Sequence, residues 1–236
     1  MNTAPSSDTV VTSNRARPGW PEIFAGAATY VVGLLVVSVT LPLVENAAIQ
    51  GIVAFFISGA LGLLAFAVAA LIRIRALRPF GFRRAAPSKV LVGAGLGVVA
   101  YLLGVLAAII YVTVTGDAEN VQGSYQASAA GGALSLTLAL VTGALLTPLG
   151  EEAFFRGVLA NALLQRYRAW IAVVVSAAIF ALAHGINPVL PVAFVVGVLT
   201  ALLFRWSGSI WPGVALHGMN NATALIVPLV LGVTTG

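Results

Sequence analysis

The chain has 236 residues, of which 60% are hydrophobic and 8% charged, with a formal net charge of +5 and no cysteine. Soluble domains average about 25% charged residues, so this chain cannot cover a water-facing surface and is predicted to be an integral membrane protein. The lack of cysteine excludes disulfides and cysteine nucleophiles. The excess of basic residues is explained better by orientation in a membrane and contact with anionic lipid headgroups than by binding to nucleic acid.

Residues 1–20 are polar and rich in Ser, Thr and Pro, without the apolar core of a signal peptide, so we expect a disordered tail. Residues 21–236 are expected to form a single transmembrane helical domain. A spanning helix needs about 20 apolar residues, and runs of that kind lie at about 22–44, 48–72, 90–115, 133–166, 169–185, 188–204 and 209–231. The sequence therefore predicts an all-α polytopic membrane protein with about seven transmembrane helices.

The basic residues predict the orientation of these helices. All but one lie in the tail or between spans: Arg15, Arg17, Arg73, Arg75, Arg78, Arg83, Arg84, Lys89, Arg166, Arg168 and Arg205. Alternating spans place them on one side, which the positive-inside rule identifies as the cytoplasm, with the N-terminus inside and the C-terminus outside. The loop 116–132 has no Lys or Arg and is too polar and glycine-rich for a helix in lipid, so we expect it outside.

The segment 133–166 is too long for one perpendicular crossing. Its 34 residues would extend over about 51 Å at 1.5 Å per residue, against a hydrocarbon core about 30 Å thick. Pro148 and Gly150 are expected to break the helix just before Glu151, because proline removes a helical hydrogen bond. A new helix beginning there would direct free N–H groups and a positive dipole end at the nearby carboxylates.

The sequence EEAFFR carries the charged residues of this segment. Glu152 and Arg156 are four residues apart, so a carboxylate and a guanidinium share one helical face and can pair. Glu151 lies about 100° around the helix and faces a different neighbour. A carboxyl group without a close cation in a low dielectric has a raised pKa, which a general base acting on water requires. We therefore assign the base to Glu151.

Two later spans carry the only histidines of the chain. Phe180 and His184 are four residues apart on one helical face, and so are His217 and Asn221. For any one polar residue a hydrogen bond between helices explains its presence as well as function does. Ionisable groups on three separate spans together favour a site, whereas an aromatic ring such as Phe180 on an apolar face is typical of packing.

The depths of these residues, counted along each helix from its cytoplasmic end, are not all equal. Glu151 and His184 both lie about 22 Å from the cytoplasmic end of their helices, so they can meet, but His217 lies only about 12 Å from that end. This difference of about 10 Å requires a short last helix or a connection at 206–210 that dips into the core. A Gly-x-Ser-x-Gly elbow, a Ser-x-x-Lys pair and a His-Glu-x-x-His helix are all absent from the sequence.

The ordered set Glu-Glu-x-x-x-Arg at 151–156, Phe-x-x-x-His at 180–184 and His-x-x-x-Asn at 217–221 resembles the CPBP intramembrane proteases. This family comprises the type II CAAX prenyl-protein endopeptidases and the bacteriocin-processing or Abi proteins, and the resemblance covers about 133–231. It implies an intramembrane endopeptidase of the CAAX or the leader-processing type. The polar site would lie among the C-terminal four helices.

The resemblance also implies roles for individual residues. Glu151 would activate the hydrolytic water with help from His184, and His217 and Asn221 would stabilise the oxyanion. Glu152 and Arg156 would support the site, and Phe180 is expected to contact substrate. The favoured glutamate mechanism requires no cofactor, although Glu151, His184 and His217 could also hold zinc or another divalent metal with one position open.

The expected partners are membrane lipid and a peptide or membrane-anchored protein substrate, with no nucleic acid, in a multi-pass protein of a prokaryotic plasma membrane. Substrate and water require a cavity among spans four to seven, open to the cytoplasm or laterally. One alternative is a proton-coupled transporter, because intramembrane Glu, His and Arg also mark proton relays. The other is a catalytically silent scaffold or immunity protein of the same fold.

Overall fold

The computed structural model describes residues 16–232, and no strand occurs in this range. Its long single helices are α1 (Trp20–Thr40), α2 (Ala47–Leu71), α3 (Pro87–Thr115), α9 (Val189–Ser207) and α10 (Trp211–Val230). Another continuous helix consists of α5 (Ala133–Leu140), η3 (Val141–Leu146), α6 (Thr147–Glu152), η4 (Ala153–Ala160) and α7 (Asn161–Leu164). The shorter elements are η1 (Leu41–Leu43), η2 (Arg78–Phe80), α4 (Gly123–Ala130) and α8 (Ala169–Leu182).

Six of these helices are long and apolar enough to cross a membrane, which confirms the predicted multi-pass architecture. The predicted span at 169–185 corresponds to α8, which is apolar but has only 14 residues. A helix of that length extends over about 21 Å, less than the ~30 Å hydrocarbon core. The predicted tail lies outside the described residues as far as residue 15, and α1 already begins at Trp20.

The predicted helix break before Glu151 is wrong. The helix continues through Pro148 from Ala133 to Leu164, with π-helical stretches η3 and η4 on either side of α6. In η3 the N–H of Thr147 donates to the carbonyl of Thr142, five residues earlier. Such wide turns accommodate a proline that cannot donate to the ordinary ladder, and they occur often at functional sites. The long helix therefore has no N-terminus of its own at the carboxylates.

The predicted outer loop 116–132 contains one short helix, α4, outside all six candidate spans. The ring of Tyr125 on α4 lies 4.2 Å from that of Phe55 on α2, measured between centroids. Ser135 at the start of the long helix donates its hydroxyl to the carbonyl of Ser128 at 2.6 Å. Segment 116–132 is therefore folded against the bundle by these contacts.

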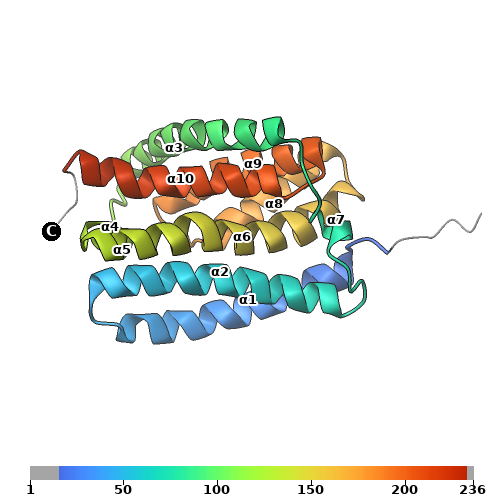
Figure 1. Ribbon diagram of the computed structural model, residues 1–236, viewed down its shortest axis with the longest axis horizontal. Helices are drawn as coiled ribbons and strands as arrows, with labels where there is room; N and C mark the ends of the chain where they lie inside the picture. The colour runs from blue at the N-terminus through green and yellow to red at the C-terminus, as the bar shows by residue number, and fades with distance from the viewer. Residues whose placement is uncertain (1–15, 233–236) are drawn as a thin grey trace, which may run out of the picture.

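Basic side chains from several segments donate to the backbone of other segments at one end of the bundle, which we call the basic end. Arg73 pairs with buried Glu22 at 2.8 Å and donates to the carbonyl of Arg17. Lys89, at the start of α3, donates to the carbonyl of Trp206 at the end of α9. Figure 1 shows α7 at this end, and α4, the start of α5 and the end of α10 at the opposite end.

The half of the bundle between Glu152 and the basic end is filled by apolar side chains. We call it the packed half, and its large buried side chains include Ile23, Phe66, Phe80, Phe154, Phe155, Val158, Leu159, Leu163 and Leu203. Aromatic rings interlock there: Phe66 packs edge-on against Phe80 with centroids 5.2 Å apart, and Phe154 packs in the same way against Phe155. This close packing fixes the segment of the long helix that follows Glu151 and Glu152.

Candidate active site

The helix that carries the glutamates touches α2 through its backbone. A Cβ atom built on Gly150 would overlap the carbonyl oxygen of Gly59, so a larger residue at either position would force the two helices apart. Thr147 adds a hydrogen bond across the same contact by donating its hydroxyl to the carbonyl of Phe55 at 2.7 Å. Small residues allow this kind of close approach between membrane helices. The face of α2 next to Gly59 therefore lies directly against Glu151.

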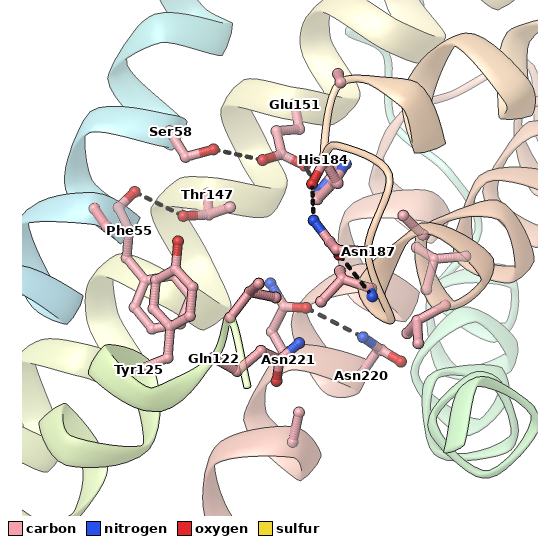
Figure 2. Close-up of a pocket in the computed structure, with 18 of the residues that line it drawn as sticks. Phe55, Ser58, Gln122, Tyr125, Thr147, Glu151, His184, Asn187, Asn220 and Asn221 are labelled. Atoms are coloured by element: carbon pink, nitrogen blue, oxygen red, sulfur yellow. Dashed lines mark hydrogen bonds and ion pairs between the residues drawn. The ribbon is translucent and has the colours of Figure 1, made fainter. Parts of the chain in front are cut away.

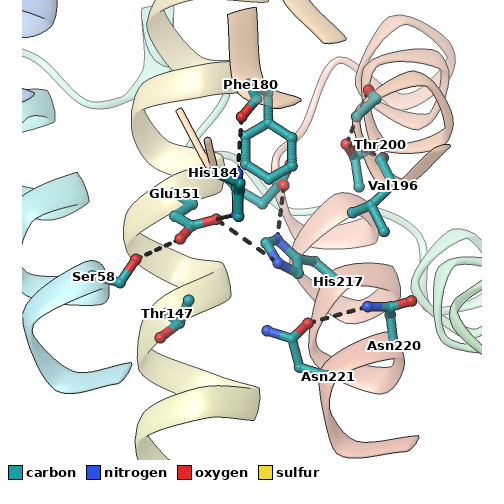
Figure 3. A network of polar contacts seen from close by, with 12 residues as sticks. Ser58, Thr147, Glu151, Phe180, His184, Val196, Thr200, His217, Asn220 and Asn221 are labelled. Atoms are coloured by element: carbon teal, nitrogen blue, oxygen red, sulfur yellow. Dashed lines mark hydrogen bonds and ion pairs between the residues drawn. The ribbon is translucent and has the colours of Figure 1, made fainter. Parts of the chain in front are cut away.

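Glu151 lies at the centre of the site (Figures 2 and 3). Its Oε1 atom accepts a hydrogen bond of 2.6 Å from the hydroxyl of Ser58 on α2. Its Oε2 atom lies 4.0 Å from His184 Nε2 and 3.8 Å from His217 Nε2. Oε2 is buried and has no hydrogen-bond partner among the described residues. These distances are too long for direct hydrogen bonds, but they suit a single water bonded to the carboxylate and one imidazole.

The other ring nitrogens of the two histidines set their tautomers. His184 Nδ1 lies 2.9 Å from the carbonyl oxygen of Phe180, and His217 Nδ1 lies 3.3 Å from Glu152 Oε1. Carbonyl and carboxylate oxygens only accept, so each Nδ1 carries a proton and donates it. In a neutral imidazole the Nε2 lone pair is then free, and both Nε2 atoms face the same oxygen of Glu151.

The predicted pair of Glu152 and Arg156 forms, with Nε 3.2 Å from Oε2, and both side chains are buried. The guanidinium also lies over the ring of Phe180, 4.4 Å from its centroid. The contact from Glu152 to His217 was not predicted, and it joins the ion pair to the imidazole. Two carboxylates and one guanidinium carry a formal charge of −1 when both imidazoles are neutral, so one added proton makes the site electrically neutral.

Phe180 is buried between the guanidinium of Arg156 and the imidazoles of His184 and His217. Its ring lies edge-on to His184 and His217, with centroids 4.8 and 5.8 Å apart, and its face covers Arg156. Its carbonyl orients His184. These contacts explain why an aromatic residue stands at this position, whereas the predicted contact with substrate stays a prediction.

Asn221 also lies at the site, one turn of α10 beyond His217 (Figure 3). Its side-chain amide donates to the carbonyl of Gly143 in η3 at 2.9 Å, and its oxygen accepts from Asn220 at 3.1 Å. These bonds hold α10 against the π-helical stretch. The predicted role of Asn221 at the oxyanion stays a prediction.

The mismatch in the depth of His217 is explained by the connection before α10, which dips into the bundle. Ser209 and Ile210 are fully buried. The N–H of Ile210 donates to the carbonyl of Gly81 at 3.1 Å, and the hydroxyl of Ser209 donates to the carbonyl of Arg83. α10 therefore begins below the surface of the basic end, and its second turn reaches the level of Glu151.

Sequence reasoning missed three residues of the site: Ser58, Asn187 and Asn220. Asn187 donates to the carbonyl of His184 at 2.8 Å and accepts from the N–H of Val189, so it shapes the turn that carries His184 (Figure 2). The run His-Gly-x-Asn is a turn signal that could have found it. No sequence signal indicates Ser58, because serines in spans usually bond their own helix backbone.

A cavity of about 610 Å³ borders the site. It was predicted among spans four to seven, whereas its lining also includes side chains of the first three long helices. It is lined by Glu151, both histidines and Asn221, and by apolar side chains of α1, α2, α3, α9 and α10. Apolar walls with a few convergent polar groups are typical of sites that bind an organic ligand or a peptide.

The donor types of Glu151, His184 and His217 suit a divalent metal, but their spacing does not. Ligand atoms on a tetrahedral zinc ion lie about 3.3 Å apart, whereas the carboxylate oxygen lies 3.8 and 4.0 Å from the two imidazole nitrogens. Across residues 16–232 no group of three or more His, Asp or Glu side chains is placed to hold a metal ion. We therefore derive no step through a metal.

The fold and the buried polar centre define a multi-pass membrane protein with an intramembrane site. Residues 133–223 match the family model described as type II CAAX prenyl endopeptidase Rce1-like, which confirms the resemblance predicted from the sequence over this region. All six predicted polar site residues lie inside the match, while α1, α2 and α3 lie outside it. No curated protein and no solved structure matches the chain. The description of that family names an endopeptidase, and the match covers 133–223 of the 236 residues.

Proposed function

We propose that the protein is an intramembrane endopeptidase that hydrolyses a peptide bond with water activated by Glu151. The observation that carries this proposal is the environment of Glu151 Oε2. This atom is buried, has no hydrogen-bond partner within residues 16–232 and faces two imidazole nitrogens at 3.8 and 4.0 Å. An acceptor held in this way lacks only a donor that enters the cavity, and water is such a donor. The family match supports the same reaction class.

In the proposed reaction, water lies between Glu151 and His184, whose Nε2 accepts one of its hydrogen bonds. One water proton passes to Glu151 Oε2 as the water oxygen bonds to the peptide carbonyl carbon and the carbonyl oxygen becomes an oxyanion. When this intermediate collapses, the carbon–nitrogen bond breaks and the leaving amine receives the proton from Glu151. General base catalysis of this kind contributes about 10²–10⁴-fold to the rate.

His217 donates to the oxyanion only when its Nε2 carries a proton, because its Nδ1 proton already points at Glu152. Glu152 Oε1, which lies 3.3 Å from Nδ1, is the counter-ion of the imidazolium that this requires, and the imidazolium cancels the remaining formal charge of the site. Asn221 is proposed as the second donor to the oxyanion. The ion pair of Glu152 with Arg156 thereby serves the reaction through His217.

The substrate is proposed to be a peptide or a membrane-anchored protein in a prokaryotic plasma membrane, processed at a CAAX-type or a leader-type site. Proton-coupled transport is the alternative that the cluster of Glu, His and Arg favours. A transporter needs a path on both sides of the site, whereas the packed half closes one side with apolar side chains. A catalytically silent scaffold of the same fold would not require Glu151 Oε2 to be buried at the cavity without a partner among the described residues.

The proposal is tested by comparing the peptides of membranes that carry the wild-type protein, the Glu151→Gln variant or no copy of the protein. We expect cleavage products only with the wild type and with Arg84→Gln, a control that introduces glutamine at an exposed residue of the α2–α3 connection. The same products with Glu151→Gln would remove the assigned base. Proton flux into proteoliposomes without any product would favour transport.

A further inference from the structure

The cavity extends from the active site in one direction only. Besides the site residues, its lining includes Leu41, Glu119, Val121, Gln122, Pro188 and Pro228. These positions belong to η1, the segment before α4, the turn before α9 and the end of α10, which lie away from the basic end (Figure 1). None of the lining residues is Lys or Arg.

On the other side of the site, the chain is closed. Glu152 and Arg156 are buried beneath Glu151, and the packed half follows them. Phe80 and Ile210, from the two connections that cover the basic end, are fully buried as well. No residue of the α2–α3 connection or of the turn before α10 lines the cavity.

The short helix α8 accounts for the direction of the hollow. It begins at Ala169 beside the basic end and ends at Leu182 after 14 residues. Its end therefore lies about 9 Å short of crossing a 30 Å hydrocarbon core. The following turn carries His184 and Asn187, which line the cavity. Irregular backbone at this depth is tolerated where it borders protein or water. Water in the part of the cavity beyond the end of α8, which we call the vestibule, can therefore hydrogen-bond the backbone groups of the turn.

The charge distribution assigns this vestibule to one side of the membrane. Arg and Lys residues of four segments gather at the basic end, and cytoplasmic loops carry the excess of such residues. The segments at the mouth contain Glu45, Asp117 and Glu119 and no Lys or Arg. We propose that the active site is reached from the non-cytoplasmic face, in contrast to the cytoplasmic or lateral opening expected from the sequence.

Together with the proposed function, on which this step rests, the vestibule defines a class of substrate. The scissile bond lies in an extended, mainly uncharged segment that enters from the outer face of the membrane. The mouth has an acidic side chain, Glu119, and offers no cation to a free C-terminal carboxylate. Internal bonds near the outer surface, with basic residues flanking them, therefore suit this mouth better than a cytoplasmic carboxy terminus does.

The access route can be tested without any protease assay, because the chain contains no cysteine. Ala118→Cys lies at the mouth and Ala86→Cys at the basic end, and both positions are exposed. In spheroplasts of cells that make the full chain, a membrane-impermeant maleimide is expected to label only Ala118→Cys until the membrane is permeabilised. Any other labelling pattern in intact spheroplasts overturns the assignment.

A third variant tests whether the vestibule is open. Ala224→Cys lines the cavity on α10, about one turn beyond Asn221 in the direction of the mouth. A small charged methanethiosulfonate reagent added outside is expected to modify it, more slowly than Ala118→Cys. Labelling of Ala118→Cys without modification of Ala224→Cys overturns an opening on this face.

The peptide comparison separates this inference from the proposed function. Cleavage sites confined to cytoplasmic segments would overturn the access route and leave the endopeptidase intact. Modification of Ala224→Cys from outside with no peptide cleaved would do the reverse.

Discussion

The two halves of this bundle are built in opposite ways. The half toward the basic end is filled by interlocking aromatic and aliphatic side chains and contains the buried pair of Glu152 and Arg156. The opposite half encloses a cavity of about 610 Å³. The two adjacent glutamates lie at the boundary, so one is neutralised by packing and pairing while the other faces the space where substrate and water can enter.

This difference shows how two adjacent residues of one helix, about 100° apart around its axis, can have separate roles in stability and in chemistry. Glu152 and Arg156 lie on the face that packs, and their charges are compensated within the protein. Glu151 is turned toward the hollow half, where Ser58 holds one oxygen and the other has no partner among the described residues. Substitutions on the packed side should therefore affect stability first, and those on the hollow side should affect activity first.

The largest effect on stability is expected from Arg156→Met. It leaves the carboxylate of Glu152 buried without its cation, which costs about 3–5 kcal/mol. Thermal unfolding in detergent, followed by size-exclusion chromatography, should show the loss. Arg205→Met, at an exposed arginine of the basic end, is the matched control and should change stability by less than about 0.5 kcal/mol. Equal stability of the two variants would contradict the claim that Arg156 compensates the buried charge of Glu152.

A smaller loss is expected from Gly150→Ala. Its methyl group would overlap the carbonyl oxygen of Gly59, and overpacking of this kind costs about 1–3 kcal/mol. Because the contact also places Ser58, activity should fall together with stability. Gly95→Ala provides the control, since no atom lies within 4 Å of the added carbon there. If the two alanine variants behaved alike, the backbone contact would not hold the site.

Ser58→Ala is expected to lower activity more than stability, because Ser58 borders the cavity. It removes the hydrogen bond to Glu151 Oε1, and we expect kcat/KM to fall about tenfold, which corresponds to ~1.4 kcal/mol, with little change in unfolding temperature. Ser58→Thr should restore most of the activity. A shifted pH profile of kcat would show that the serine acts through the carboxylate.

The control for this serine is Ser176→Ala. Ser176 is buried too, but it donates to the carbonyl of Val173 in its own helix. We expect full activity from this variant. If both serine variants lost activity equally, a general effect on packing would explain the result.

The smallest effect is expected from chelators. The spacing of Glu151, His184 and His217 is too wide for a tetrahedral metal, so treatment with a zinc chelator should leave cleavage within about twofold. Loss of activity that only zinc restores would show that the three side chains close around a metal during the reaction.

Much of this site could be predicted from the sequence, because its signals are local. Spacing along single helices predicted that Glu152 pairs with Arg156, and counting residues predicted that Glu151 meets His184; both are confirmed. Ser58 could not be predicted, since its contact depends on two glycines that meet across helices about ninety positions apart.

The errors also have physical causes. Pro148 looked like a helix break because the wider turns of η3 leave no signature in the sequence. The opening of the cavity depends on α8 ending after 14 residues. The hydropathy of 169–185 does not reveal that end, because the residues beyond it remain partly apolar.

The central claim is tested most directly with purified protein in liposomes and one peptide identified as a substrate in membranes. Cleavage by the wild type and by Glu151→Gln should be compared at matched unfolding temperatures. We predict that the cleavage rate falls by at least about 10²-fold while the unfolding temperature stays unchanged, because Glu151 acts as the base and borders the cavity without stabilising the fold. Cleavage within twofold of the wild type would contradict the account.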